Sequence, residues 1–186
     1  AYVGLADAHA FLTLEGQPAR DRYDKAIGIV KKALEIDDNL GEAHASMGLL
    51  LQDRDWDLRG AEREYKRALD LSPNYGSAHH WYGEPLLQLG RFDEAVEHFR
   101  RALEVDPLSS AIASDLGISL FYARRYDEAI AELRKVVQAD PRFSRTHHYL
   151  ARVLAQLGRH REALDELQKG WLFEGQPPDD VARRTA

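Results

Sequence analysis

A period of 34 residues constrains the fold of this chain more than any other feature of its sequence. The segment GRFDEAVEHFRRALEVDP, residues 90–107, returns as RRYDEAIAELRKVVQADP at residues 124–141 and, more faintly, as GRHREALDELQKGWLFEG at residues 158–175. A fixed period of this length is typical of repeat proteins, in which one unit cannot bury its apolar face alone and stacks on its neighbours. We therefore expect a row of similar units.

Each unit combines small and large residues at fixed positions. In the third unit Ala95, Phe99 and Ala102 recur at i, i+4 and i+7, which places them on one buried stripe of a helix. The first half of the unit has a small residue where a neighbouring helix must approach within about 8–10 Å. These small residues are Gly48, Gly83, Gly117 and Ala151. The unit is therefore expected to be a pair of antiparallel helices, closed by a proline in three units, at Pro73, Pro107 and Pro141.

The pattern predicts ten helices along the chain. We expect them near residues 2–13, 21–37, 41–53, 57–71, 76–89, 92–105, 110–122, 126–139, 144–157 and 160–173. The corresponding units cover residues 1–40, 41–75, 76–109, 110–143 and 144–177, in a single solenoid over 1–177. The second unit has one extra residue in its turn, DRDWDLRG. Residues 178–186 are expected to form a frayed tail, because the segment has little apolar surface to bury.

This pattern resembles the tetratricopeptide repeat, which has a bulky residue, a Leu-Gly pair, an aromatic residue, and then Ala, Phe, Ala and Pro at fixed offsets. The resemblance covers nearly the whole chain. It implies an all-α fold, a right-handed α-solenoid of about five antiparallel helix pairs with a concave inner face. It also implies a non-catalytic scaffold that binds a protein or a peptide. The matching residues of the third unit are Tyr82, Gly83, Ala95, Phe99, Ala102 and Pro107.

The composition fits a soluble globular chain. Of its 186 residues, 44% are hydrophobic and 30% are charged, and the formal net charge is −6. Lysines and arginines alternate with acidic residues along the predicted helices, whereas a protein that binds nucleic acid normally has a basic stripe. We therefore expect no nucleic-acid partner. With no cysteine, the chain has no disulfide and no thiolate metal site.

No membrane segment or signal peptide is evident. The sequence lacks a run of about 18 apolar residues, and its start, AYVGLADAHAF, lacks the basic residues and the cleavage site of a secretory signal. The expected location is the cytoplasm, with no membrane partner. Because the chain opens on alanine inside an apolar helical pattern, we expect it to be a piece of a longer protein, whose own signal or anchor stays open.

The sequence predicts no enzymatic activity, no cofactor and no metal site. It contains no phosphate-binding glycine loop, no GxSxG elbow and no HExxH motif. Consecutive histidines, as in His79-His80 and His147-His148, point about 100° apart on a helix and cannot chelate one ion. Three of the histidines share the bulky position of their units, where packing or a polar contact is favoured over metal ligation. These three are His44, His79 and His147.

By the resemblance, the first helix of each pair lines a concave groove, and this groove is the predicted partner-binding surface. Trp, Tyr and Arg dominate binding hot spots, so we expect a partner with an acidic end and an apolar anchor. For the aromatic residues, packing between repeats remains an alternative to binding. The candidate residues are His80, Trp81, Glu84, Gln88, Asp115, Ile118, Tyr122, Arg145, His148, Tyr149 and Arg152.

Two features qualify this surface. Some tetratricopeptide proteins hold a terminal carboxylate with a lysine and asparagine clamp, but the corresponding positions here include His80, Glu84, Ser114 and Ile118, so this chain does not match the clamp. Pro85 lies inside a predicted helix, where it removes one backbone hydrogen bond. Either the helix tolerates a kink there, or the bend widens the groove.

A second function class remains open. Several segments, among them SAHHWYGEPLLQLGRFDEAVEHFRRALEVDPLS, resemble repeats at the C-terminal side of bacterial multidomain signalling proteins, including transcriptional regulators and Ser/Thr kinases. The chain would then be a sensor or a self-association segment, for example of a homodimer. Apolar residues near its end, Trp171 and Phe173, are the candidates for contact between copies.

Overall fold

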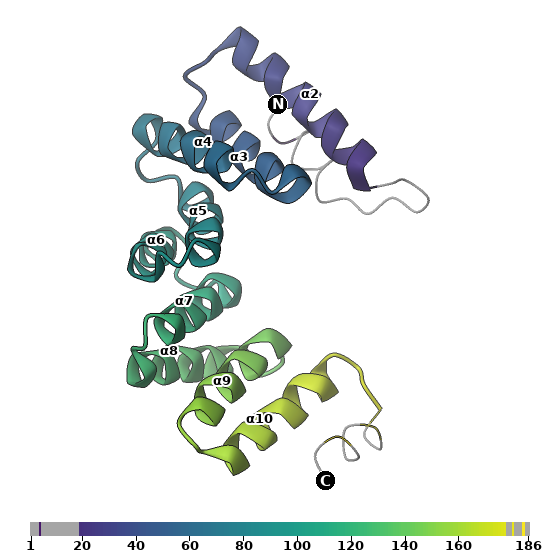
Figure 1. The fold of residues 1–186 in the computed structure, drawn as a ribbon, viewed down its shortest axis with the longest axis vertical. Helices are drawn as coiled ribbons and strands as arrows, with labels where there is room; N and C mark the ends of the chain where they lie inside the picture. The colour runs from purple at the N-terminus through teal and green to yellow at the C-terminus, as the bar shows by residue number, and fades with distance from the viewer. Residues whose placement is uncertain (1–3, 5–18, 178–179, 181–183, 185–186) are drawn as a thin grey trace. The chain divides into compact units, whose positions relative to one another are not determined.

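The computed structural model describes residues 4, 19–177, 180 and 184, and the regular elements among them are all α-helices (Figure 1). The predicted helix at residues 2–13 and most of the predicted tail at 178–186 lie outside the described residues. The helices are α2 (Ala19–Ile36), α3 (Gly41–Asp55), α4 (Leu58–Leu71), α5 (Gly76–Gln88), α6 (Phe92–Val105), α7 (Ser110–Tyr122), α8 (Tyr126–Ala139), α9 (Ser144–Gln156) and α10 (His160–Phe173).

The chain divides into two compact units, Ala1–Gly90 and Arg91–Ala186. The boundary lies between the two helices of the third predicted repeat. Unit 1 contains the hairpin of α3 and α4, which α2 and α5 contact, and unit 2 contains the hairpins α7–α8 and α9–α10 together with α6 (Figure 1). The single solenoid over residues 1–177 stays a prediction.

Small residues on the first helix of a pair do allow the second helix to approach closely. A Cβ atom added to Gly48 on α3 would lie 2.8 Å from the ring of Tyr65 on α4, and one added to Gly117 on α7 would lie 2.5 Å from Leu133 on α8. Tyr65 and Leu133 are fully buried. The predicted contact of a small residue with a large one is therefore confirmed in both units.

Each of the described turns between paired helices contains one residue with a left-handed backbone. In the turn after α5 this residue is Gly90 (φ 74°), and in the turn after α9 it is Gly158 (φ 73°), as expected for a residue without a Cβ atom. The same conformation is taken by Trp56 (φ 55°) after α3 and by Arg124 (φ 61°) after α7, where a side chain makes it unfavourable. Two of the turns therefore contain a strained residue.

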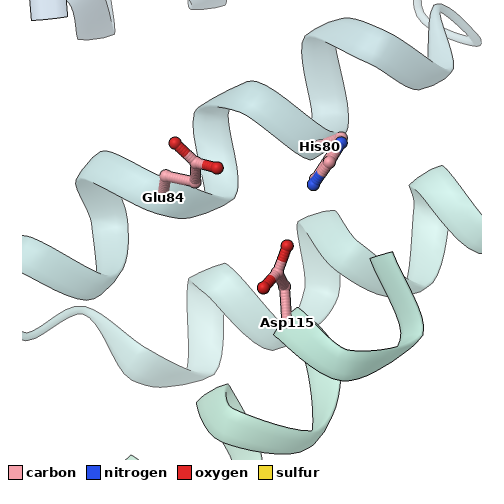
Figure 2. A group of neighbouring side chains, drawn as sticks. All are labelled: His80, Glu84 and Asp115. Carbon is pink, nitrogen blue, oxygen red and sulfur yellow. The ribbon is translucent and has the colours of Figure 1, made fainter. Parts of the chain in front are cut away.

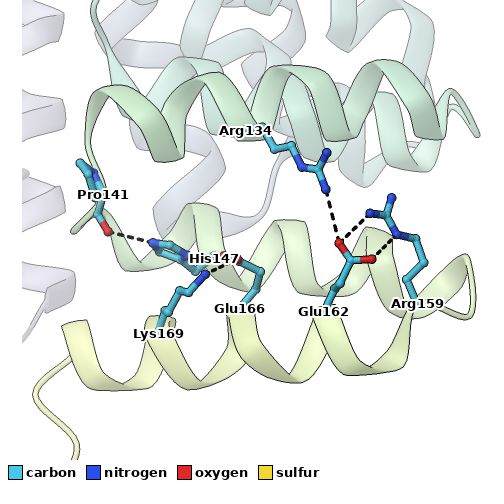
Figure 3. A network of polar contacts seen from close by, with 7 residues as sticks. All are labelled: Arg134, Pro141, His147, Arg159, Glu162, Glu166 and Lys169. Carbon is cyan, nitrogen blue, oxygen red and sulfur yellow. Dashed lines mark hydrogen bonds and ion pairs between the residues drawn. The ribbon is translucent and has the colours of Figure 1, made fainter.

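In unit 2 the second helices are joined by a ladder of ion pairs. Arg125 and Arg159, which precede α8 and α10, each bind the glutamate three residues later through two hydrogen bonds of 2.6–2.7 Å. Glu162 also lies 3.5 Å from Arg134 of α8 (Figure 3). Glu128 pairs in the same way with Arg100 of α6, at 3.4 Å. The ladder is exposed, so each of its ion pairs contributes little to stability.

Pro85 does not end its helix. Helix α5 continues from Gly76 to Gln88 through the proline, which is buried, and the backbone N–H of Leu89 donates to the Pro85 carbonyl at 2.9 Å. Whether the proline widens a groove stays a prediction.

Candidate protein-binding surfaces

Tyr122 and Arg152 meet on the surface of unit 2. Arg152 lies on α9, and its Nη1 donates a hydrogen bond of 2.9 Å to the hydroxyl of Tyr122, the last residue of α7. The Tyr122 ring is stacked on Phe92 with a centroid distance of 5.5 Å, yet the residue remains 41% exposed. Two residues predicted for partner binding, 30 positions apart in the sequence, therefore form one surface feature.

The second predicted arginine, Arg145, is partly buried at the start of α9. Its Nη2 lies 3.5 Å from Oδ2 of Asp115 on α7, and its guanidinium lies 5.4 Å from the centroid of the Phe143 ring. Asp115 is 5% exposed and Ile118 is 4% exposed. Because neither side chain offers surface to a partner, we leave Asp115 and Ile118 out of the binding surface proposed below.

His148 is directed toward the last helix of the chain. Its Nε2 lies 2.8 Å from Oε1 of Glu174, and its ring centroid lies 6.4 Å from that of Trp171. A Cβ atom added to Gly170 would lie 2.8 Å from the His148 ring. The histidine therefore packs against α10, while Tyr149, the next residue, is partly exposed.

In unit 1 a chain of hydrogen bonds fixes the predicted residue Glu84. The buried hydroxyl of Tyr65 donates to Oε1 of Gln52 at 3.3 Å, and Nε2 of Gln52 donates to Oε2 of Glu84 at 3.2 Å. Burial, and then the negative charges of Glu84 and Asp53, raise the pKa of Tyr65, so this hydroxyl stays protonated and remains a donor. The amide of Gln52 thus has a fixed orientation.

Figure 2 draws three of the predicted polar residues: His80 and Glu84 on α5 of unit 1, and Asp115 on α7 of unit 2. His80 and Glu84 lie one helical turn apart and project from the same side of α5, as their i, i+4 spacing predicts. Trp81, the residue after His80, is partly buried and packs against Ala45, Ala68 and Ala78. The packing interpretation therefore has structural support for Trp81.

Two of the three histidines at the bulky position are buried, and each of their rings contacts a glutamate through one nitrogen and a backbone oxygen through the other. Nδ1 of His44 lies 2.7 Å from Glu64, and its Nε2 lies 3.0 Å from the backbone oxygen of Asp38. His147 is bound in the same way between Glu166 and Pro141 (Figure 3). These contacts are polar and join both helices of one repeat to the loop from the preceding repeat. The expectation of a polar contact is therefore confirmed for His44 and His147.

Sequence reasoning missed a cleft in unit 1. It has a volume of about 140 Å³ and lies at the C-terminal ends of α3 and α5. Its lining includes Gln88, which was predicted for partner binding, but also Trp56, an aromatic residue that is 72% exposed. The extra residue in the turn of the second repeat was the available signal, because it marks the place where this turn departs from the others. The lining residues are Tyr23, Gln52, Asp53, Trp56 and Gln88.

The two residues predicted for self-association differ in exposure. Phe173 is 40% exposed, and its ring centroid lies 5.3 Å from that of His147. Trp171 is partly buried, and the guanidinium of Arg184 lies 5.4 Å from its ring centroid. The neighbouring Leu172 is 43% exposed, so α10 does present apolar surface.

Within the described part of the chain, no helix is both long and apolar enough to cross a membrane.

Comparison with protein families gives two matches. Two models of the tetratricopeptide repeat match residues 55–116 and residues 114–180. Adjacent stretches of the chain thus match repeats of the same kind. A comparison with curated proteins gives no match.

Solved structures share the fold. MamA from Desulfovibrio magneticus RS-1, residues 41 to the end, is 20% identical, with 93% of this chain and 93% of that chain covered and a TM-score of 0.76. MamA from AMB-1 is 24% identical, with 94% and 99% covered and a TM-score of 0.74. YrrB, a TPR protein with an unusual peptide-binding site, is 20% identical, with 98% and 89% covered and a TM-score of 0.73. These likenesses show an all-α solenoid of helix pairs.

Proposed function

Because this chain belongs to the tetratricopeptide repeat family, we propose that it is a non-catalytic scaffold that binds a protein or peptide at a surface centred on Tyr122 and Arg152. The hydrogen bond between these two exposed residues is the observation that supports the surface most directly. Tyrosine and arginine are among the residue types that contribute most to protein interfaces. YrrB, a neighbour in fold, is a peptide-binding protein, which agrees with this class of function.

The chemistry of the surface favours a carboxylate on the partner. Arginine has five N–H donors, and Arg152 uses Nη1 on Tyr122. Among the described residues no carboxylate pairs with Arg152, so its other donors can bind one in a bidentate arrangement. The Tyr122 ring, stacked on Phe92, offers a rigid apolar platform beside it. The partner is therefore a segment with an acidic group next to a large apolar side chain.

A selection from a random peptide library tests this proposal. Wild-type protein should enrich peptides that combine Asp, Glu or a free C-terminus with one large apolar residue. Arg152→Glu should lose this enrichment. The control Arg161→Glu reverses the charge of an exposed arginine on a different helix, α10, and should keep the enrichment. Enrichment of basic peptides by the wild type, or of the same acidic peptides by Arg152→Glu, would overturn the surface.

A second candidate function is self-association through α10, supported by its exposed Leu164 (40%) and Leu172 (43%). Residues eight positions apart are separated by about 80° around an α-helix, so the two side chains project from adjoining sides of α10. This alternative suits a dimerisation or sensor segment of a cytoplasmic bacterial regulator. Light scattering over a wide concentration range, for the wild type and for Leu164→Glu with Leu172→Glu, distinguishes the two. A wild-type dimer that the double substitution dissociates would support self-association through α10. A wild-type monomer at every concentration would rule self-association out.

A further inference from the structure

The cleft of unit 1 suits a side chain better than a whole ligand. Small-molecule sites usually have volumes of roughly 300–1,000 Å³, whereas this cleft has about 140 Å³. The aromatic residues Tyr23 and Trp56 and the carboxylate of Asp53 contribute to its lining. Aromatic faces attract cations, and a carboxylate pairs with them. The chemistry of the lining is therefore that of a site for a positively charged group.

The negative charge in this cleft lacks a cation of its own. Among the described residues, no lysine, arginine or histidine forms an ion pair with Asp53. The neighbouring Arg54 is held instead by Asp24 and by Asp55, the latter at 2.8 Å. Desolvation raises the pKa of Asp53, which means that the ionised carboxylate lacks full compensation in its present surroundings. A cation from outside the chain would supply that compensation.

Part of the lining is held in place before any ligand arrives. The Gln52 amide is fixed between Tyr65 and Glu84 by two hydrogen bonds. The backbone of Trp56 is held at the end of α3, because its N–H donates to the carbonyl of Gln52 at 3.1 Å. A preorganised site loses less conformational entropy when it binds.

Trp56 itself occupies a position that does not favour it. Its φ of 55° lies in the left-handed region, where two other turns of this chain have Gly90 and Gly158. With 72% of its surface exposed, the residue gains little from burial to offset this strain. Strained residues are concentrated at ligand-binding sites. Because Arg124 has the same backbone conformation and is also exposed, the strain at Trp56 supports a site only together with the cleft that this residue lines.

We propose that this cleft binds the side chain of a lysine or arginine of a protein partner, with the cation between the aromatic residues Trp56 and Tyr23 and the Asp53 carboxylate. The inference rests on the proposed scaffold function only in taking the cation to belong to a protein. The chain would then have two sites of opposite preference, a surface in unit 2 that binds an acidic group and a cleft in unit 1 that binds a basic side chain. The partner chemistry that follows is a segment, or two segments, with both acidic and basic side chains.

The experiment is a titration of the full chain with Nα-acetyl-lysine N-methylamide, followed by NMR through the indole N–H of Trp56. Removal of this signal in Trp56→Gly assigns it among the three tryptophans. We expect a saturable shift, and no such shift with the Nε-acetylated probe, which has the same stem without the charge. Asp53→Asn should weaken binding about fivefold, because a charge pair in a partly solvated setting contributes about 1 kcal/mol.

Two variants separate loss of the site from loss of the fold. Trp56→Gly lacks the indole reporter, so its titration is followed through the side-chain amide of Gln88, which also lines the cleft. This variant should abolish binding while its melting temperature stays equal to or above that of the wild type, because glycine relieves the backbone strain. Asp55→Asn removes a charge near the end of α3 outside the cleft lining, and should leave the affinity within about twofold. Equal shifts from the two probes, or an unchanged affinity in Asp53→Asn, would overturn the site. Failure here leaves the acidic-peptide selection on Arg152 unaffected, so the two proposals fail separately.

Discussion

Nδ1 of His147 lies 2.6 Å from Oε2 of Glu166, and the same two positions of the second repeat are occupied by His44 and Glu64 at 2.7 Å. The partners are 19 residues apart in one repeat and 20 in the other. The extra residue in the turn of the second repeat accounts for the difference. The contact is therefore a property of the repeat, which a change in turn length does not disrupt.

Replacement of the partly buried carboxylate of Glu166 should weaken the fold in a pH-dependent way. Burial alone would raise the pKa of Glu166, but hydrogen bonds and charges from Lys169 and His147 outweigh it and lower the pKa. The ionised carboxylate therefore stabilises the fold above the ordinary glutamate pKa of about 4.3, and this stabilisation is lost as the pH falls through the lower folded value. Glu166→Gln should reduce the free energy of unfolding by roughly 2 kcal/mol at pH 7.

Urea denaturation at pH 7 and at lower pH measures this effect. Between about pH 5 and pH 3 the wild type should lose more stability than Glu166→Gln, because only the wild type has this carboxylate to protonate. Asp165→Asn is the matched control, since it removes an exposed charge from the neighbouring position. Parallel pH profiles of the wild type and Glu166→Gln would contradict the assigned role of the pair.

The exposed ladder should behave differently from the partly buried pair of His147 and Glu166. Hydrogen bonds from Arg159 lower the pKa of Glu162 although the carboxylate is exposed to solvent. Because the Debye length falls to about 3 Å at 1 M salt, charge interactions in the ladder should be screened there. Glu162→Gln should therefore change the melting temperature less than Glu166→Gln does. The change should shrink in 1 M NaCl, and a change that persists there would mean that packing, not charge, is lost.

Substitution by alanine should have opposite effects at two glycines, one where helices pack closely and one where the surroundings are open. Gly117→Ala should destabilise the protein by about 1–3 kcal/mol, because the new methyl group would overlap the buried Leu133. Gly28→Ala on α2 meets no atom within 4 Å and should stabilise by about 0.5–1 kcal/mol through helix propensity. Thermal unfolding of both variants is the measurement. Equal tolerance of the two would contradict the helix spacing.

Arg124 offers a test of backbone strain away from any proposed site. Its φ of 61° is left-handed and its side chain is exposed. Arg124→Gly should raise the free energy of unfolding by up to about 1 kcal/mol, whereas Arg124→Ala retains a Cβ atom and should not. Denaturation midpoints of the two variants give the comparison, and a stabilising alanine would point to a cause other than the backbone.

Helix positions were predictable from the sequence because the signals are local. The segments expected at 92–105, 110–122, 126–139 and 160–173 match α6, α7, α8 and α10 at both ends. Local chemistry explains this accuracy, since Ser109, for example, accepts a hydrogen bond from the backbone of Ile112 at the start of α7. Helix α3 instead runs to Asp55, two residues beyond the expected end, because the irregular turn follows it.

The candidate sites were less predictable, because they depend on how helices rotate about their axes. Repeat register assigned Ile118 and Tyr122 to one surface, but Ile118 is buried and Tyr122 is exposed. The pairing of Tyr122 with Arg152 joins different repeats, and no local pattern specifies it. The cleft at Trp56 arises from a left-handed residue in an irregular turn, where the repeat pattern gives no guidance.

The dissociation constant of one selected acidic peptide tests the central claim most directly. Fluorescence anisotropy would compare the wild type, Tyr122→Ala, Arg152→Glu and Arg161→Glu at the same ionic strength. We predict that Tyr122→Ala and Arg152→Glu each weaken binding by about tenfold or more, as for hot-spot residues, and that Arg161→Glu does not. Unchanged affinity in Arg152→Glu, with the peptide still bound by the wild type, would contradict the claim that this surface binds the partner.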